Sequence, residues 1–157
     1  MKLLFVHADY INYQVKEKAK SAEEIPRDCK SGGMREPLIV FACAEKADEK
    51  SSDATESTLT EIKSVASKIK TENITIFPFA HLSDELATPE TAVQILKCVE
   101  CKLVDEGYNV LRVPFGWYKV FEFRSKGHPL AVLSRSIPRK TNPAALSSKV
   151  GCGPHVE

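Results

Sequence analysis

The chain has 157 residues, 43% of them hydrophobic, which is enough for one ordinary domain to fill a core without disulfides or a metal. Its 22 basic residues nearly balance 21 acidic ones, which argues against a long nucleic-acid duplex across the whole surface. A basic or aromatic patch can still hold a nucleic-acid end. The apolar run at residues 3–6 is too short for a signal peptide or a membrane span, so we expect a cytoplasmic protein with no membrane partner.

The cysteines predict reduced thiols, because five of them at irregular spacing do not suit a disulfide framework. Cys98-x-x-Cys101 and Cys152-x-x-His155 together would supply four zinc ligands. The first pair falls inside a helical pattern, however, and the second lies in a segment that contains proline and glycine. We therefore expect no metal site.

The amino-terminal part predicts strands on both sides of a polar segment. Residues 2–7 have the composition of a buried strand, and residues 11–15 alternate apolar and polar side chains as a half-exposed strand does. Residues 16–36 contain a proline and two glycines and predict a long surface loop. Residues 37–45 then return to strand.

A helix and a short strand follow. Asp53-x-x-Glu56 has the spacing of a capping box, and apolar residues recur behind it at helical intervals, which predicts a helix over residues 54–70. The next apolar segment is a short strand that Pro78 interrupts. His81 comes just past its end and should lie on a loop.

The carboxyl-terminal half predicts a second helix and three strands. Thr88, Pro89 and Glu90 form a helix start, and an apolar stripe leads to a terminator at Gly107. Three further segments have strand character: NVLRVPF, WYKVFEF and HPLAVLS. Because strands at both ends flank only two helices, we expect a mixed or antiparallel sheet and no doubly wound one.

The common motifs of nucleotide binding and serine hydrolysis are absent: no Gly-rich phosphate loop, nucleotide fingerprint or G-x-S-x-G elbow is present. Polar residues instead gather at the predicted strand ends: His7, Asp9, His81, Lys119 and His128. A loop histidine is more often a hydrogen-bonding surface residue than a catalyst, and we assign His7 and His128 that role. His81 follows two phenylalanines, a position from which it can face a pocket.

Lys119 lies on the apolar face of its predicted strand. Alternation places Trp117, Phe121 and Phe123 on the same face. An ammonium among three aromatic side chains either extends past them to water or is held where desolvation and a ligand can use it. The pattern by itself leaves both interpretations open.

Three segments resemble, in order and spacing, the amino-terminal editing domain of archaeal threonyl-tRNA synthetases: HADYINYQVKEKA, FPFAHLSDELATPETAVQILK and NVLRVPFGWYKVFEFRSKGHPLAVLSR. The resemblance covers residues 1–137, which we take as the editing domain, and leaves residues 138–157 as a linker or disordered tail. It implies a mixed α/β fold like that of the D-aminoacyl-tRNA deacylases. In that fold, mixed or antiparallel sheets carry two main helices packed on one side.

The resemblance also implies a function. The domain would hydrolyse seryl-tRNA(Thr) made by threonyl-tRNA synthetase, with water activated mainly by the 2′-hydroxyl of the terminal adenosine and with no cofactor. It implies catalytic roles for Lys119 and His81, and substrate-binding roles for Phe115, Trp117, Tyr118, Ala80 and Pro78. The implied partners are the 3′ acceptor end of tRNA(Thr), a second copy in a homodimer, and the catalytic and anticodon-binding domains of a synthetase in cis or in trans.

Such proofreading has a physical reason. A threonine site cannot reject serine strongly, because one missing methyl group is worth only about 1–3 kcal/mol. Hydrolysis after charging needs a positioned water and donors aimed at the developing oxyanion, and Lys119 is suited to that role. The resemblance therefore favours a functional Lys119 over one that merely reaches solvent.

The chain departs from the family pattern at Val132, where a glutamate is usual, and at Ala8 and Ser125, where serine and cysteine are usual. Val132 favours an alternative in which the domain only grips the acceptor end or dimerises. A second alternative is a D-aminoacyl-tRNA deacylase. That family's Gly-Pro signature is missing from the body of the fold, since Gly153-Pro154 lies in the tail.

Overall fold

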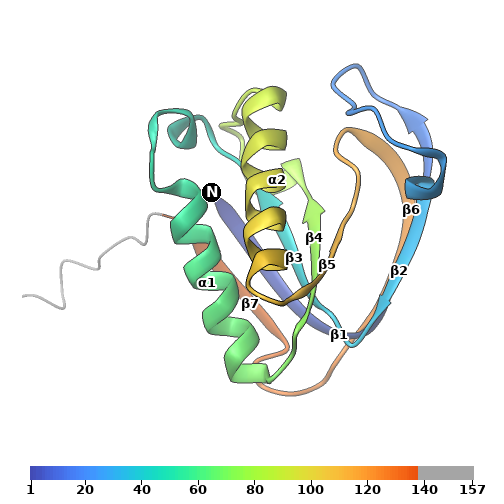
Figure 1. The fold of residues 1–157 in the computed structure, drawn as a ribbon, viewed down its shortest axis with the longest axis vertical. Helices are drawn as coiled ribbons and strands as arrows, with labels where there is room; N and C mark the ends of the chain where they lie inside the picture. Colours follow the sequence, from blue (N-terminus) through green and yellow to red (C-terminus); the bar gives the residue numbers. More distant parts are fainter. Residues whose placement is uncertain (138–157) are drawn as a thin grey trace, which may run out of the picture.

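The computed structural model describes residues 1–137, and the predicted tail at residues 138–157 lies outside the described residues. The described chain forms seven strands and two α-helices, and strands and helices follow one another in the predicted order: three strands, a helix, a strand, a helix and three strands (Figure 1). Their bounds are β1 Lys2–Lys18, β2 Ser31–Arg35, β3 Leu38–Cys43, α1 Ala54–Ile69, β4 Asn73–Pro78, α2 Pro89–Asp105, β5 Asn109–Arg112, β6 Trp117–Ser125 and β7 Val132–Ser136. Three 3₁₀ turns join them: η1 Arg27–Lys30, η2 Lys46–Lys50 and η3 Ala80–Leu82.

β1 organises the sheet. Its first half pairs antiparallel with β3 and β7, and its second half pairs antiparallel with β2 and β6. β4 pairs parallel with β3, and β5 pairs parallel with β4. The result is a mixed, nearly closed sheet, which confirms the predicted sheet class (Figure 1).

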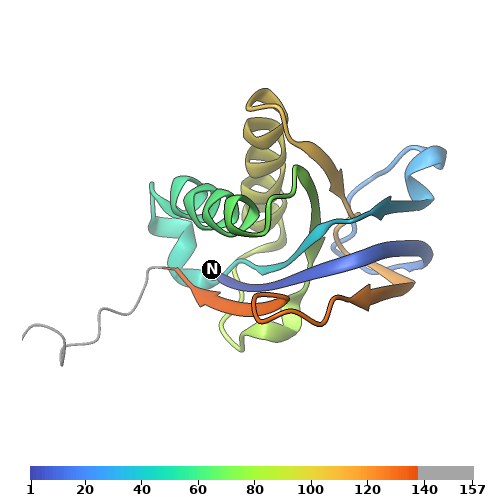
Figure 2. The same cartoon turned by 90° about the horizontal axis from the view of Figure 1, so that it is seen from below.

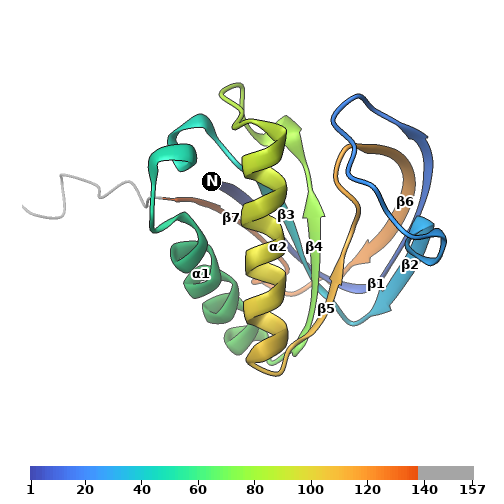
Figure 3. The same cartoon turned by 45° about the horizontal axis from the view of Figure 1, so that its top comes forward.

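Both helices cover the same face of the sheet (Figures 2 and 3). Salt bridges from Lys63 to Glu106 and from Lys102 to Glu56 join the two helices along their exposed sides. Alternate residues of a strand point to opposite faces, so β1, β3 and β4 each contribute to two cores. The core under the helices includes Leu3, Phe5, Leu38, Val40, Ile74, Ile76, Leu59, Ile62, Leu96 and Val99, and the core on the other face includes Val6, Ile11, Tyr13, Ile39, Phe41 and Phe77.

The structure corrects the prediction for the amino-terminal part. The two predicted strands at residues 2–7 and 11–15 are one continuous strand, β1, and β2 lies within the predicted loop. β2 has the sequence SGGMR, with no β-branched or aromatic residue, so its composition does not indicate a strand. It pairs with β1 because its glycines make room: a Cβ on Gly32 would lie 2.8 Å from the Tyr13 ring.

The helix boundaries are close to the predicted ones. The Thr88 side chain caps α2, and Gly107, at a φ of 93°, follows its end. The capping box predicted at Asp53 is wrong, since the Asp53 side chain makes no cap hydrogen bond. A reciprocal capping pair occurs instead between Glu45 and Asp48, at the start of η2.

Cys98 and Cys101 lie on α2, as the helical pattern predicted, and both are exposed, whereas Cys152 and His155 lie outside the described residues. Within residues 1–137, no group of three or more His, Cys, Asp or Glu side chains is arranged to hold a metal ion. The helices of this same part of the chain are all too short or too polar to cross a membrane.

Candidate active site

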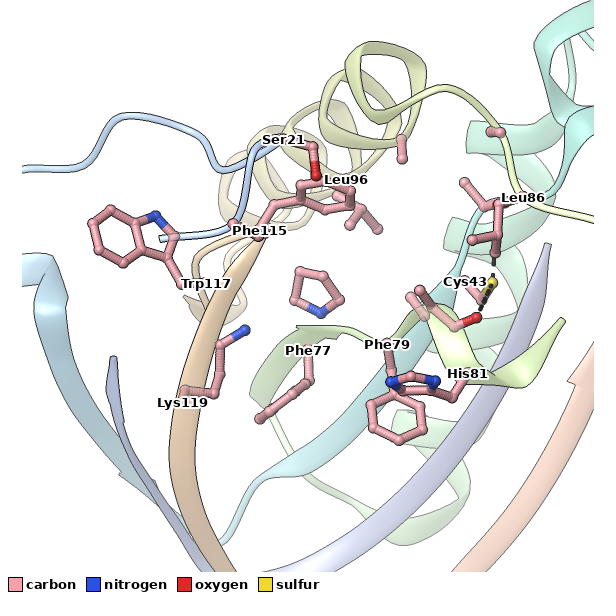
Figure 4. Close-up of a pocket in the computed structure, with 18 of the residues that line it drawn as sticks. Ser21, Cys43, Phe77, Phe79, His81, Leu86, Leu96, Phe115, Trp117 and Lys119 are labelled. Carbon is pink, nitrogen blue, oxygen red and sulfur yellow. Dashed lines mark hydrogen bonds between the residues drawn. The ribbon is translucent and has the colours of Figure 1, made fainter. Parts of the chain in front are cut away.

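A cavity of about 340 Å³ opens beyond the carboxyl ends of β3 and β4, beside the first turns of α2 (Figure 4). Ligands bind preferentially outside the carboxyl ends of parallel strands, where loops and helix starts converge. All seven residues that the sequence assigns to the site line this cavity: Lys119, His81, Phe115, Trp117, Tyr118, Ala80 and Pro78. Segments far apart in the sequence therefore meet here.

Lys119 is held inside the cavity wall. Its ammonium donates a hydrogen bond to the carbonyl oxygen of Pro114 at 3.0 Å and lies 5.2 Å from the centroid of the Phe77 ring. Burial lowers the pKa of Lys119 to about 8, and the negative charge of Glu23 opposes part of that fall. An ammonium has three N–H donors, so two remain to meet a ligand.

The side chains of β6 around Lys119 alternate between the outer and the inner face of the strand, as predicted. Tyr118 and Val120 are 65% and 60% exposed on the outer face, whereas Lys119 and Trp117 are half-buried on the inner face. Figure 4 shows the Lys119 ammonium pointing toward the cavity. The sequence left open whether the Lys119 ammonium extends to water or is held where a ligand can use it. The structure supports the second interpretation.

His81 lies on the opposite wall, in η3, with Phe77 between it and Lys119 (Figure 4). Its ring meets that of Phe79 edge to face, with centroids 5.4 Å apart. The next wall residue is Cys43, which is buried and whose thiol approaches the Ala80 carbonyl oxygen at 3.7 Å. Burial raises the pKa of this thiol, so it stays protonated at neutral pH.

The aromatic residues of the site differ in orientation. Phe115 lines the roof next to Leu96, and the Trp117 ring points away from the cavity (Figure 4). The Trp117 indole N–H donates to the carbonyl oxygen of Glu23 at 2.9 Å, so this ring fastens the chain outside the cavity. Phe115 is therefore better placed than Trp117 to stack on a ligand.

Part of the roof comes from residues 19–25, here called the roof loop, which sequence reasoning left as a plain polar loop. Ala19 and Ser21 of this loop line the cavity. The Ala19 N–H donates to the Gly116 carbonyl oxygen at 3.0 Å. Gly116 has a φ of 75°, and a Cβ there would lie 2.6 Å from the Ala22 Cα, so only glycine lets the roof loop approach so closely.

Several residues singled out in the sequence lie away from the cavity: His7, Ala8, Asp9, Ser125, His128 and Val132. Val132, in β7, pairs with Val6, is 55% exposed and does not line the cavity. The assignment of His7 to the surface is wrong: it is 8% exposed, and its Nδ1 lies 2.7 Å from Nε2 of His128. The chain between β6 and β7 folds back over β1 and covers His7.

The surroundings of His7 and His128 affect the pKa of His7 and determine the tautomer of His128. Burial and then the neighbouring His128 lower the pKa of His7. The Leu130 N–H points at Nδ1 of His128 at 3.2 Å, so that nitrogen accepts and Nε2 carries the proton given to His7. This pair therefore joins the β6–β7 segment to β1.

Comparison with known proteins identifies the family. The family model described as the archaea-specific editing domain of threonyl-tRNA synthetase matches residues 1–137. Threonine–tRNA ligase of Thermococcus onnurineus is 51% identical over 139 residues, which cover 87% of this chain and 22% of that protein. The ligase of Methanocaldococcus jannaschii is 47% identical over 141 residues (89% and 22%), and that of Methanopyrus kandleri is 42% identical over 151 residues (96% and 24%).

The match extends over the whole described part of the chain, including every strand and helix that borders the cavity. The chain spans less than a quarter of the length of these relatives. The resemblance seen in the sequence is thus confirmed, and the chain belongs to the archaea-specific editing (deacylase) domain family of threonyl-tRNA synthetase.

Proposed function

We propose that this domain hydrolyses seryl-tRNA(Thr) and leaves threonyl-tRNA(Thr) intact. The observation that carries the proposal is the Lys119 ammonium, held half-buried in a cavity of about 340 Å³ that Phe115 and His81 also line. A cavity of this size accommodates a small ligand. Family membership supplies the context of proofreading.

The proposed reaction needs few protein groups. The water oxygen bonds to the ester carbonyl carbon, and the bond from that carbon to the 3′ oxygen of the terminal ribose breaks. The 2′-hydroxyl of the same ribose takes a proton from the water and passes its own proton to the departing 3′ oxygen. The products are serine and tRNA with a free 3′ end, and no cofactor enters the balance.

Lys119 acts in this scheme as a donor. Because its pKa is about 8, most molecules carry the ammonium at pH 7, and its two spare N–H groups can hold the ribose or the developing oxyanion. A lysine in this form does not serve as general base. Phe115 would stack on the adenine, Pro78 and Ala80 would border the aminoacyl group, and His81 would hold it from the opposite wall.

The wider assignments belong to the same proposal. We place the fold with the D-aminoacyl-tRNA deacylases, the protein in the cytoplasm, and two copies in a homodimer. Because the relatives are about four times longer, the 3′ end of tRNA(Thr) would arrive from catalytic and anticodon-binding domains in cis or in trans.

The test uses tRNA(Thr) charged with serine or with threonine as the substrate. Its deacylation is measured with the purified protein at catalytic and at stoichiometric amounts. Rapid loss of serine alone supports the proposal. Loss of neither amino acid, with the tRNA still bound, would contradict it and identify a binding module. Release of D-amino acids alone would identify the other deacylase activity.

A further inference from the structure

Glu23 is a buried carboxylate that the proposed chemistry does not use. Its side chain is 7% exposed although it lies on the roof loop. Oε1 accepts from Arg112 Nη1 at 2.5 Å and from the Phe115 backbone N–H at 2.8 Å. Oε2 accepts from Arg112 Nη2 at 3.3 Å and lies 3.5 Å from the Lys97 ammonium.

The backbone of Glu23 adds two more bonds. Its N–H donates to the Phe115 carbonyl oxygen at 3.2 Å, and its carbonyl oxygen accepts from the Trp117 indole at 2.9 Å. One residue thus joins the roof loop to the corner between β5 and β6. That corner carries Phe115 and leads directly to Lys119.

We propose that Glu23 is a positioning residue: it fastens the roof loop over the cavity and supplies the negative charge that stabilises the Lys119 ammonium. The proposal rests on the proposed deacylase function, because it concerns how that site is held. Glu23 itself touches no reacting atom.

The electrostatics of the cavity agree with this role. The Glu23 carboxylate accepts from the Phe115 N–H, and the carbonyl oxygen of the same peptide unit, that of Pro114, accepts from the Lys119 ammonium. Burial disfavours the charged form of Lys119, and the nearby charge of Glu23 favours it. The pKa of Glu23 is itself lowered, first by its hydrogen bond with Arg112 and then by that with Phe115, against the effect of burial. Its carboxylate therefore stays charged at neutral pH.

The remaining titratable and charged groups on the elements around Lys119 are Glu17 and Lys18 of β1, Cys43 of β3, His81 of η3, Lys97 and Glu100 of α2, Arg112 of β5 and Tyr118 of β6. Arg112 also binds Glu100, at 2.6 Å, so two acids and two bases share this network. If the Glu23 charge were lost, the positive charges of Arg112 and Lys97 would outnumber the single negative charge of Glu100 beside Lys119. A local excess of positive charge disfavours a third ammonium.

The experiment compares Glu23→Gln with Glu24→Gln in the full chain. Glu24 is adjacent in sequence and loses the same charge, but its side chain is 86% exposed and pairs with Lys18. Two quantities are followed: the titration of Lys119 by NMR of ¹³C-labelled lysine, assigned with Lys119→Arg, and the pH profile of kcat/KM for seryl-tRNA(Thr).

We expect Glu23→Gln to move the Lys119 midpoint, and with it the alkaline limb of kcat/KM, to lower pH by about half a unit or more, and Glu24→Gln to move neither. An unshifted Lys119 titration in folded Glu23→Gln would overturn the proposal. If the unmodified chain hydrolyses no seryl-tRNA, the deacylase assignment fails, and the NMR titration still decides whether Glu23 stabilises the ammonium.

A second variant separates the fastening role from the charge. Glu23→Asp keeps the charge but is too short to reach Arg112 and the Phe115 N–H together. We expect its Lys119 midpoint to stay near that of the unmodified chain, while KM rises about threefold or more with a smaller change in kcat. An unchanged KM in this variant would contradict the fastening role, even if Glu23→Gln did not fold.

Discussion

The ammonium of Lys119 is fastened to the carbonyl oxygen of Pro114 at 3.0 Å, five residues earlier in the chain. This bond spans the corner between β5 and β6, so the lysine and Phe115 are placed by the same turn. The backbone of the corner is in turn bound to the roof loop. The orientation of Lys119 therefore depends on two separate parts of the sequence, the roof loop and the corner that leads into β6.

Lys119→Met should abolish most deacylation. Methionine keeps the length of the side chain but offers no donor, and loss of one such donor costs about 100-fold or more in kcat. The measurement is single-turnover hydrolysis of seryl-tRNA(Thr), with binding of the uncharged tRNA as a second readout. Lys68→Met, on the exposed surface of α1, is the matched control and should retain full activity. Equal rates in the two variants would remove Lys119 from the mechanism.

The stability of the chain should depend on pH through Lys119. Its pKa falls from the usual 10.5 in the unfolded chain to about 8 in the fold, so the unfolded state binds more protons between these values. Stability therefore gains from this group as pH rises from about 8 to about 10.5. Denaturant melts should show this gain as a difference between the unmodified chain and Lys119→Met. Parallel stability curves for the two proteins would show that the lysine is not desolvated.

Three glycine-to-alanine variants should separate strain from crowding. Gly116→Ala combines a φ of 75° with a clash 2.6 Å from Ala22, Gly107→Ala has a φ of 93° with open space, and Gly127→Ala has neither. We expect destabilisation of about 1–3 kcal/mol or more at Gly116, about 1 kcal/mol at Gly107 and almost none at Gly127.

The same series also tests the roof loop. Gly116→Ala should raise KM for seryl-tRNA(Thr), because the new Cβ pushes the loop away from the cavity, whereas Gly107→Ala should leave KM unchanged. Thermal melts and initial rates measure the two effects. A Gly116→Ala protein with the KM of the unmodified chain would show that the roof loop does not border the substrate.

The hydrogen bond between His7 and His128 should weaken in acid. The pKa of His7 is lowered, so the stability from this group is fully present above the unfolded value of 6.5 and is lost as pH falls through the lower folded value. A double-mutant cycle with His7→Ala and His128→Ala should give a coupling of about 0.5–1.5 kcal/mol at pH 7.5, and this coupling should decline as the pH falls through the lowered pKa of His7. A coupling that persists unchanged in acid would contradict the assigned tautomers.

Local patterns in the sequence predicted the helices and strands whose conformation is set by residues within the same segment. The 3.6-residue stripe and the Thr88–Pro89 start predicted α2, because a helix satisfies its backbone hydrogen bonds within one segment. Alternation predicted the inner face of β6 and thus the placement of Lys119 among aromatic residues. The order of the three motif segments was specific enough to predict the family, which the comparisons confirm.

The tertiary structure decided what depends on pairing between distant segments. β2 has no strand-like composition and forms because Gly32 and Gly33 fit against Tyr13 and Asn12 of β1. Glu23 carries no local signal, since its partners Arg112 and Phe115 are about ninety residues away. A strand partner or a buried ion pair is chosen by contacts that no window of neighbouring residues contains. The sequence alone therefore predicted the family and, through the resemblance, seven residues of the cavity, and only the fold decided what else lines it and what holds these residues in place.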